Sequence, residues 1–323
     1  MQMDKPSRTA AHVAALRGLG LLLPPSARLV DDPFGAEWTG CGRLRQLAKA
    51  MPAAAQRVSR PAWRWLLYMQ VRTFALDEEV VRFAQSDGRQ LILLGAGLDA
   101  RALRLRRLGL RVFEVDHSAT QAKKRRLVGD AATFVAWDFE HDPLRLLPER
   151  LCDLGYRRDE RGCVVWEGVT MYLSEAANAA TFAMLADLLA VDSVVAFTYF
   201  AKELLAAPAW RERLVRQFVA SHGEPWVFGW EPDLLPAWLA ARGFVLERDD
   251  TTTTLAAQWL PADLAARVKG DQRRIALARR RTPKVEAYPV DYLEPIQEEI
   301  DAANDACKES FKTGHWVPVN RRP

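Results

Sequence analysis

From residue 90 onward, short apolar runs that suit buried strands alternate with stretches that suit helices. Five such runs lie in the middle of the chain, at 90–94, 110–115, 133–136, 163–166 and 194–199. Helices are predicted between them at 98–108 and 118–128, and Ser174 is expected to cap a further helix after the fourth run. Strands that alternate with helices pair in parallel, because the connecting helix returns the chain to the same end of the sheet. The sequence therefore predicts an α/β fold with a doubly wound, mostly parallel sheet.

The segments that flank this alternation differ from it. Residues 1–86 show no strand pattern, and apolar residues between Trp63 and Phe83 recur at helical spacing, so this part is expected to form a helical cap. The α/β core is expected over 87–281, with a helical insertion at about 202–230 after the fifth strand. The insertion is predicted to be followed by a helix and two closing strands, at 232–241, 244–247 and 274–278.

After Arg281, acidic residues and prolines become frequent. Residues 282–323 are therefore predicted to be a C-terminal extension that contains one helix. Two interpretations stay open: the extension folds over the cleft or a neighbouring subunit with Trp316 as an anchor, or it is partly disordered. An oligomer held together by this extension is compatible with the first.

Composition narrows the class of protein. A formal net charge of only +4 gives no argument for nucleic acid, and basic runs such as 123–126 suit solvated helix faces. The apolar run at 19–23 stops at two prolines, far short of the about 20 residues that span a membrane, and no secretory signal is visible. The four cysteines show neither a CxxC pair nor metal-ligand spacing, so we expect no metal and a reduced, cytoplasmic protein.

A glycine-rich turn follows the first predicted strand, in the run LGAGLDAR at 94–101. Gly95 and Gly97 lack a Cβ, so the backbone can approach a ligand closely, and the helix that follows offers free N–H groups. Nucleotide, flavin and S-adenosylmethionine (SAM) sites all use such a loop. Because Ala100 fits the third place of the dinucleotide fingerprint, the loop alone does not exclude a dehydrogenase.

Polar side chains also follow the next three strands. Asp116, 21 residues after Gly95, can accept hydrogen bonds from two ribose hydroxyls. Asp138 can accept one from an adenine amino group while Phe139 packs on the ring. Glu167 opens the run EGVTMYL at 167–173, which adds a carboxylate and two hydroxyls. Since the carboxyl ends of parallel strands meet at one edge of the sheet, these groups are expected to share a cleft.

These motifs resemble those of the leucine carboxyl methyltransferase-like family of class I SAM-dependent methyltransferases, in particular its bacterial branch of O-methyltransferases. The resemblance covers about residues 7–281. It rests on the glycine run at 94–101, the segment EVDH at 114–117, the run at 167–173, the segment GEPW at 223–226 and the segment ARLVDDP at 27–33. The extension after Arg281 has no counterpart in the family pattern.

The resemblance implies a Rossmann-like fold, SAM as cofactor and a role for each motif position. It implies that Arg72 pairs with the SAM carboxylate, Gly95 and Gly97 form the loop at the methionine side, and Asp116 binds the ribose. Asp138 and Phe139 correspond to the adenine pocket, and Glu167 faces the methionine amino group. For Asp99 and Arg101, bracing of the loop and direct contact stay open.

The sequence says less about the acceptor of the methyl group than about the cofactor. SAM carries an activated methyl group, so alignment with an acceptor oxygen supplies most of the catalysis. A carboxylate of a small metabolite needs no general base, whereas a hydroxyl benefits from one. Tyr172 and His222 are the candidate catalytic residues. The alternatives are a methyltransferase of protein C-terminal carboxylates, a nicotinamide-dependent dehydrogenase and a non-catalytic SAM-binding protein.

Overall fold

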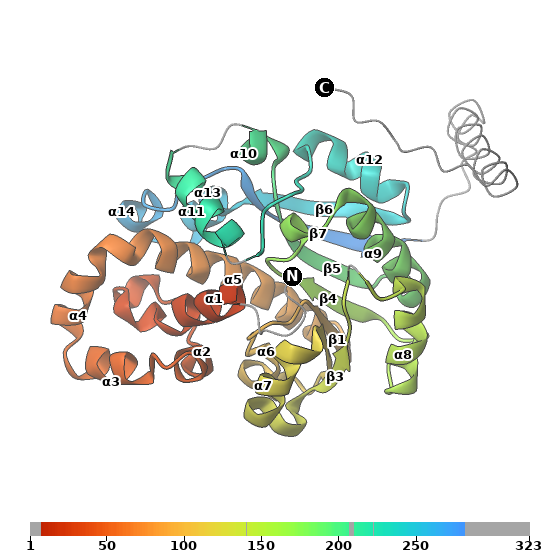
Figure 1. Ribbon diagram of the computed structural model, residues 1–323, viewed down its shortest axis with the longest axis horizontal. Helices are drawn as coiled ribbons and strands as arrows, with labels where there is room; N and C mark the ends of the chain where they lie inside the picture. Colours follow the sequence, from red (N-terminus) through yellow and green to blue (C-terminus); the bar gives the residue numbers. More distant parts are fainter. Residues whose placement is uncertain (1–7, 140, 207–209, 222, 282–323) are drawn as a thin grey trace, which may run out of the picture. The chain divides into compact units, whose positions relative to one another are not determined.

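The computed structural model describes residues 8–281 apart from 140, 207–209 and 222. Its centre is a seven-stranded sheet with the order β3-β2-β1-β4-β5-β7-β6 (Figure 1). The strands are β1 (Gln90–Leu94), β2 (Arg111–Asp116), β3 (Thr133–Ala136), β4 (Gly162–Trp166), β5 (Val194–Phe200), β6 (Phe244–Thr251) and β7 (Arg273–Arg280). The first five pair in parallel, and β7 runs antiparallel to both β5 and β6. The predicted α/β fold with a mostly parallel sheet is confirmed.

Helices cover both faces of the sheet, and β1, β4 and β5 are accordingly buried at every position. The helices that share an apolar cluster with one face are α5 (Trp63–Gln85), α13 (Thr252–Trp259) and α14 (Ala262–Ala265). Those that pack on the opposite face are α8 (Leu147–Asp153), α9 (Glu175–Leu188) and α12 (Leu235–Ala240). Figure 1 shows α8 and α9 to the right of the central strands and α5 to the left.

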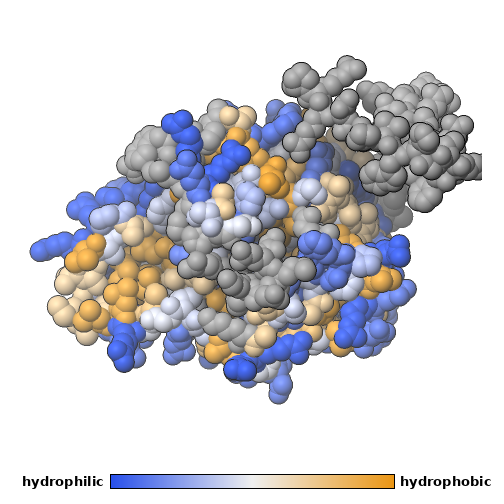
Figure 2. Space-filling view, in the orientation of Figure 1, coloured by the Kyte–Doolittle hydropathy of each residue, from blue (hydrophilic) through white to orange (hydrophobic). Residues whose placement is uncertain are grey.

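The N-terminal region is helical, and its described residues contain no strand. Its first helices are α1 (Arg8–Gly18), α2 (Pro33–Trp38), α3 (Gly42–Ala50) and α4 (Pro52–Ser59). The space-filling view shows apolar side chains at the lower left, where Figure 1 places α3 and α4 (Figure 2). The exposed ones on these helices and the residue between them are Leu44, Leu47, Met51 and Val58. Helix α5 belongs to the predicted cap, yet it packs on the sheet itself. The predicted boundary near residue 86, between the cap and the α/β core, therefore stays a proposal.

Residues 98–108 differ from the predicted single helix. Only α6 (Arg101–Arg104) and a 3-10 turn (Arg106–Leu108) are helical there. The backbone N–H of Asp99 bonds to the carbonyl of Ala96 at 2.8 Å, and its Oδ1 accepts a hydrogen bond from Arg101 N at 2.8 Å. These bonds extend the glycine turn to residue 99, so the helix begins only after it.

The other helices near the cavity follow the prediction more closely. They are α7 (Ser118–Val128), α10 (Lys202–Ala206) and α11 (Trp210–Ser221). Ser174 caps α9, because its Oγ accepts a hydrogen bond from Ala177 N at 3.1 Å. The sequence prediction missed α8, α13 and α14. The described residues, 8–281, form one compact unit, and the predicted C-terminal extension, including Trp316, lies outside them.

Candidate functional site

The glycine loop closes tightly against its surroundings. Gly95 and Gly97 adopt φ values of +62° and +47°. A Cβ on Gly95 would lie 2.4 Å from Cγ2 of Val169, and a Cβ on Gly97 would lie 3.1 Å from the Cβ of Ala10 in α1. Only glycine combines this backbone conformation with so close an approach. The backbone of the loop therefore forms a wall of the cavity described below.

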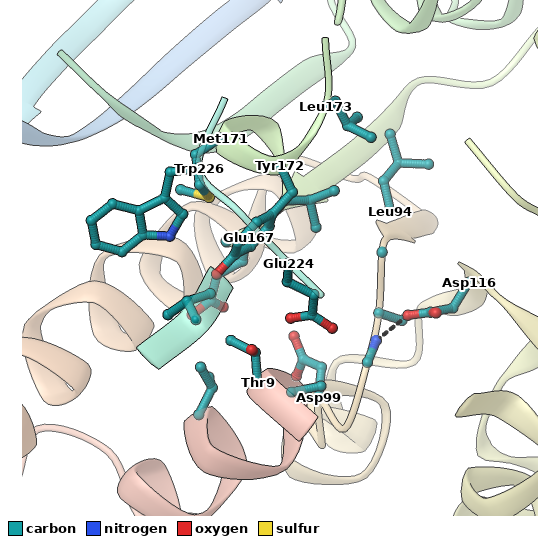
Figure 3. A pocket seen from close by; sticks show the side chains of 18 of the residues that line it. Thr9, Leu94, Asp99, Asp116, Glu167, Met171, Tyr172, Leu173, Glu224 and Trp226 are labelled. Carbon is teal, nitrogen blue, oxygen red and sulfur yellow. Dashed lines mark hydrogen bonds between the residues drawn. The ribbon is translucent and has the colours of Figure 1, made fainter. Parts of the chain in front are cut away.

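Asp116 ends β2 and faces the glycine loop (Figure 3). Its Oδ2 accepts a hydrogen bond from Gly97 N, and its Oδ1 accepts one from His117 N at 2.6 Å. Burial raises the pKa of this carboxyl, and the two N–H donors act in the opposite direction. Because each carboxylate oxygen has two lone pairs, Asp116 can still accept hydrogen bonds from a diol.

Asp138 and Phe139 follow β3 and line the same cavity. The Oδ2 of Asp138 lies 3.0 Å from Nδ1 of His141 and 3.9 Å from Nε2 of His117. Phe139 packs against the apolar cluster on the sheet face that α8 and α9 cover. The structure thus brings Asp116 and Asp138 to one edge of the sheet, as predicted, and adds two imidazoles that the sequence analysis did not consider.

A buried ion network lies beside the loop. Arg101 is fully buried and pairs with Asp99, with Asp77 (Nε to Oδ1, 2.7 Å) and with Glu167 (Nη1 to Oε2, 2.5 Å). Burial alone raises the pKa of Glu167, but Arg101 and Arg72 lower it to about 2. Burial also raises the pKa of Asp99, but the positive charge of Arg101 lowers it by more. The pKa of Asp99 therefore lies well below its usual value. Both carboxylates are ionised and fixed at neutral pH.

Arg72 and Glu167 contact each other directly. Nε of Arg72 donates to Oε1 of Glu167 at 2.7 Å, and its Nη1 donates to the hydroxyl of Tyr68 at 3.4 Å. The remaining Nη2 lies 3.6 Å from the position that a Cβ on Gly168 would take, so this edge of the guanidinium is not covered by a side chain there. Both charged groups line the cavity. Their roles toward the two ends of methionine stay predictions.

One cavity of about 1200 Å³ joins these groups and includes every described residue that we predicted for the cofactor. It extends past β4 to an apolar end beside Met171, Phe200 and Trp226. Tyr172 lies there, and burial raises the pKa of its hydroxyl to about 12. The hydroxyl is thus protonated at neutral pH and can donate a hydrogen bond, but it is not a general base. His222 lies outside the described residues, whereas Gly223 and Glu224 after it line the cavity.

The sequence analysis missed several residues of this site. Asp77 is one of many polar residues on α5, and its contact with Arg101 spans 24 positions in the chain. Nothing in the local pattern marks that contact. Glu224 belongs to the quoted segment at 223–226, which was used only for the resemblance. The described residues contain no cluster of His, Cys, Asp or Glu that could hold a metal and no helix long and apolar enough to cross a membrane.

The sheet order, with its antiparallel seventh strand and its cavity at the carboxyl ends of β1 to β4, defines the class I methyltransferase fold. Residues 10–186 match the family described as leucine carboxyl methyltransferase. This match covers more than half of the chain, from α1 to α9, and includes the glycine loop, Asp116 and Glu167. The chain belongs to this family.

Related proteins support the same family assignment. A protein of Mycobacteroides abscessus (strain ATCC 19977), named "Putative S-adenosyl-L-methionine-dependent methyltransferase", is 31% identical over 71% of this chain and 74% of its own length. A protein of Parafrankia sp. (strain EAN1pec) with the same description is 32% identical over 51% of this chain, but the match spans only 46% of that relative. The predicted family and, at the level of the family, the predicted cofactor SAM are confirmed.

A solved structure shows the same fold at low identity. A DUF574 family protein from Streptomyces avermitilis MA-4680 is 15% identical, with a TM-score of 0.51 over 83% of this chain and 97% of that protein. At this identity the likeness concerns the fold alone.

Proposed function

We propose that this protein transfers a methyl group from SAM to an oxygen, carboxylate or hydroxyl, of a small-molecule metabolite. The observation that carries the proposal is the extent of the cavity. At about 1200 Å³ it exceeds the roughly 300–1,000 Å³ of a site for one small ligand, and it joins a polar end at the glycine loop to an apolar end beside Trp226. Such a cavity has room for a cofactor and an acceptor side by side.

The polar end suits the cofactor in its residues. Asp116 retains lone pairs toward a ribose, and the loop at Gly95 and Gly97 allows close approach of its backbone. Asp138 and Phe139 would hold the adenine. Arg72 would bind the carboxylate of the methionine portion, and Glu167 would contribute negative charge toward its ammonium group.

The chain would contribute alignment and exclusion of water rather than a strong base. When bound, SAM would supply a methyl group on a sulfonium: the sulfur–carbon bond breaks as the oxygen–carbon bond forms, and the leaving group is a neutral thioether. A carboxylate acceptor attacks without losing a proton, whereas a hydroxyl releases its proton to water or to a base. Tyr172, protonated at neutral pH, would donate a hydrogen bond that orients the acceptor.

The family description favours a second candidate, methylation of the C-terminal carboxylate of a protein. The two functions differ in what must enter the apolar end of the cavity. A peptide terminus must reach it with its chain trailing into solvent, whereas a metabolite is enclosed.

Incubation of the full-length protein with SAM and a library of phenols, alcohols and carboxylic acids, with a peptide ending in leucine as one member, tests the proposal. Mass spectrometry of the products detects the gain of one CH₂. We expect methylation of a small acceptor and none of the peptide. Methylation of the peptide alone would establish the second candidate. Binding of S-adenosylhomocysteine without turnover of any acceptor would indicate a non-catalytic SAM-binding protein.

A further inference from the structure

Helices α3 and α4, which contact each other, present large apolar side chains to solvent. On α3, Leu44 is 45% and Leu47 is 56% exposed. Met51, between the helices, is 54% exposed, and Val58 on α4 is 81% exposed. Figure 2 shows apolar side chains on this part of the surface. Single exposed apolar residues are common, but a group of them indicates an interaction site. We call the exposed side chains of residues 43–60 the α3–α4 face.

The α3–α4 face carries positive charge and no acidic residue of its own. Its exposed cations are Arg43, Lys49, Arg57 and Arg60, and none of them makes an ion pair or a side-chain hydrogen bond with a described residue. No aspartate or glutamate occurs in residues 38–76, although 41 of the 323 residues of the chain are acidic. The charge of this face is therefore available to an anionic partner.

Two acidic side chains from the preceding segment lie beside α3. Asp31 pairs with Arg45, which is buried, so these two charges compensate each other. Cγ of Glu37 lies 3.8 Å from the position that a Cβ on Gly42 would take, at the first residue of α3. With both carboxylates included, the four exposed cations still leave the face with an excess of positive charge.

The other large apolar side chains that are exposed on the described part of the chain have a different environment. Each of them has an aspartate or a glutamate within three positions in the sequence. These side chains are Leu127, Leu146, Val191, Val227, Leu234 and Val245. A carboxylate so close opposes binding to an anionic surface, because like charges repel. Exposed apolar side chains among cations, without an acid between them, are thus particular to the α3–α4 face.

This combination favours a lipid surface over other partners. Helices that lie on a membrane place apolar side chains at the boundary of headgroups and acyl chains, while arginine and lysine reach the anionic headgroups with their long side chains. Nucleic acid would pair with the cations, but its phosphates gain nothing from the aliphatic side chains. A second copy of the chain, bound through the same face, would bring cations against cations.

We propose that the α3–α4 face binds the surface of membranes that contain anionic phospholipids. Leu47 and Val58, with their apolar neighbours, enter the interface, and the four exposed cations contact the lipid phosphates. Residues 43–60 contribute nothing to the wall of the cavity. The inference is therefore independent of the proposed methyl transfer, and either can fail without the other.

The first test uses the unmodified full-length protein with two kinds of vesicles, pure phosphatidylcholine and phosphatidylcholine with phosphatidylglycerol as an anionic component. Co-sedimentation at increasing lipid concentration measures the affinity for each. We expect binding to the anionic vesicles to be about tenfold tighter or more, because the cations of the face add an attraction that pure phosphatidylcholine lacks. At about 1 M salt the Debye length falls to about 3 Å, and most of this preference should disappear.

The contribution of charge is measured with the double variant Arg57→Gln with Arg60→Gln. Binding to the anionic vesicles should weaken by about fivefold for each cation, or roughly 25-fold for both. The matched control is Arg106→Gln with Arg107→Gln, which removes the same charge from an exposed turn outside the face. It should weaken the binding far less.

The contribution of the apolar side chains is measured with Leu47→Ser, which should weaken the binding roughly tenfold. Leu234→Ser is its control, because Leu234 is 59% exposed but lies outside the face. This variant should bind like the wild type. Thermal unfolding checks that all variants are folded, and we expect nearly unchanged midpoints because every substituted side chain is exposed.

Three results would overturn the inference. The first is equal affinity of the wild type for the two kinds of vesicles. The second is a loss of binding in the arginine variant but not in Leu47→Ser, which would indicate a site for polyanions such as nucleic acid. The third is a dimer, detected by light scattering without lipid, that Leu47→Ser dissociates, which would identify the face as an interface between copies of this chain.

Discussion

Nη1 of Arg101 donates to Oε2 of Glu167 at 2.5 Å and so connects the helix after the glycine loop to the segment after β4. The same guanidinium reaches Asp77 on α5 through Nε, at 2.7 Å. One fully buried arginine thus ties three separate parts of the chain together beside the cavity. The bracing role that the sequence left open for Arg101 is the one that the contacts support.

Arg101→Met is therefore expected to destabilise the protein strongly. The substitution leaves Asp77, Asp99 and Glu167 buried with less compensating charge, and removal of one partner of a buried pair costs about 3–5 kcal/mol. Urea unfolding of the two proteins measures the difference. Arg106→Met, at an exposed position of the adjacent turn, is the control and should change the free energy of unfolding by less than about 0.5 kcal/mol. Equal effects of the two substitutions would show that the network does not stabilise the fold.

Gly95→Ala should cost more than the same substitution at Gly109. The two glycines have nearly equal φ values, +62° and +66°, so the backbone strain is similar. A Cβ on Gly95 meets Val169 at 2.4 Å, whereas one on Gly109 has no atom within 4 Å. We expect Gly109→Ala to cost about 1 kcal/mol and Gly95→Ala to cost more and also weaken S-adenosylhomocysteine binding. Thermal unfolding and calorimetry distinguish the two; comparable losses would contradict the close contact.

Stability is expected to fall as the pH rises from about 5 to 8, because of Glu114. Burial raises the pKa of this carboxyl from 4.5 to about 7, although Lys124 Nζ lies 2.6 Å from its Oε2. The folded state therefore holds a proton that the unfolded chain releases above pH 4.5, and this contribution is lost as the pH rises through about 7. The loss is on the order of 3 kcal/mol.

The control for this effect is the double variant Glu114→Gln with Lys124→Met, which removes both charges. Urea unfolding at several pH values should show a smaller decline for the variant than for the wild type between about pH 5 and 8. Parallel profiles would mean that Glu114 does not titrate in this range. Glu167 behaves in the opposite sense, since its pKa is lowered from 4.5 to about 2, and its contribution is lost only below pH 4.5.

Asp116→Asn should weaken S-adenosylhomocysteine binding by roughly 10-fold or more. The amide replaces one acceptor oxygen by a donor, and a hydrogen bond to a charged group is worth about 1.5–3 kcal/mol. Calorimetry measures the loss. Asp130→Asn, at an exposed position in the turn before β3, should leave the affinity unchanged. If Asp116→Asn binds like the wild type, Asp116 does not hold the ribose.

Local sequence patterns were sufficient to predict the parallel part of the sheet. The strand at 133–136 and the helix at 118–128 end where the structure ends them, because apolar runs and chain-local turns determine both. The helix at 98–108 was predicted too long, since the contact of Asp99 with its own turn was not visible in the periodicity. The helices after β6 carry little amphipathic signal of their own and depend on packing against α5.

For the site as well, the sequence predicted the residues that directly follow strands but not the contacts between distant parts of the chain. Gly95, Gly97, Asp116 and Asp138 follow strands and were placed by topology alone. The pairing of Arg72 with Glu167 spans 95 positions and exists only in the folded chain.

The most direct test of the proposed function is a calorimetric titration of the full-length protein with S-adenosylhomocysteine and, separately, with NADH. A glycine loop with an acid at the end of the second strand is common to both classes of site, so the two ligands discriminate between them. We predict saturable binding of S-adenosylhomocysteine with one site per chain and no binding of NADH. Saturable binding of NADH without binding of S-adenosylhomocysteine would contradict the account.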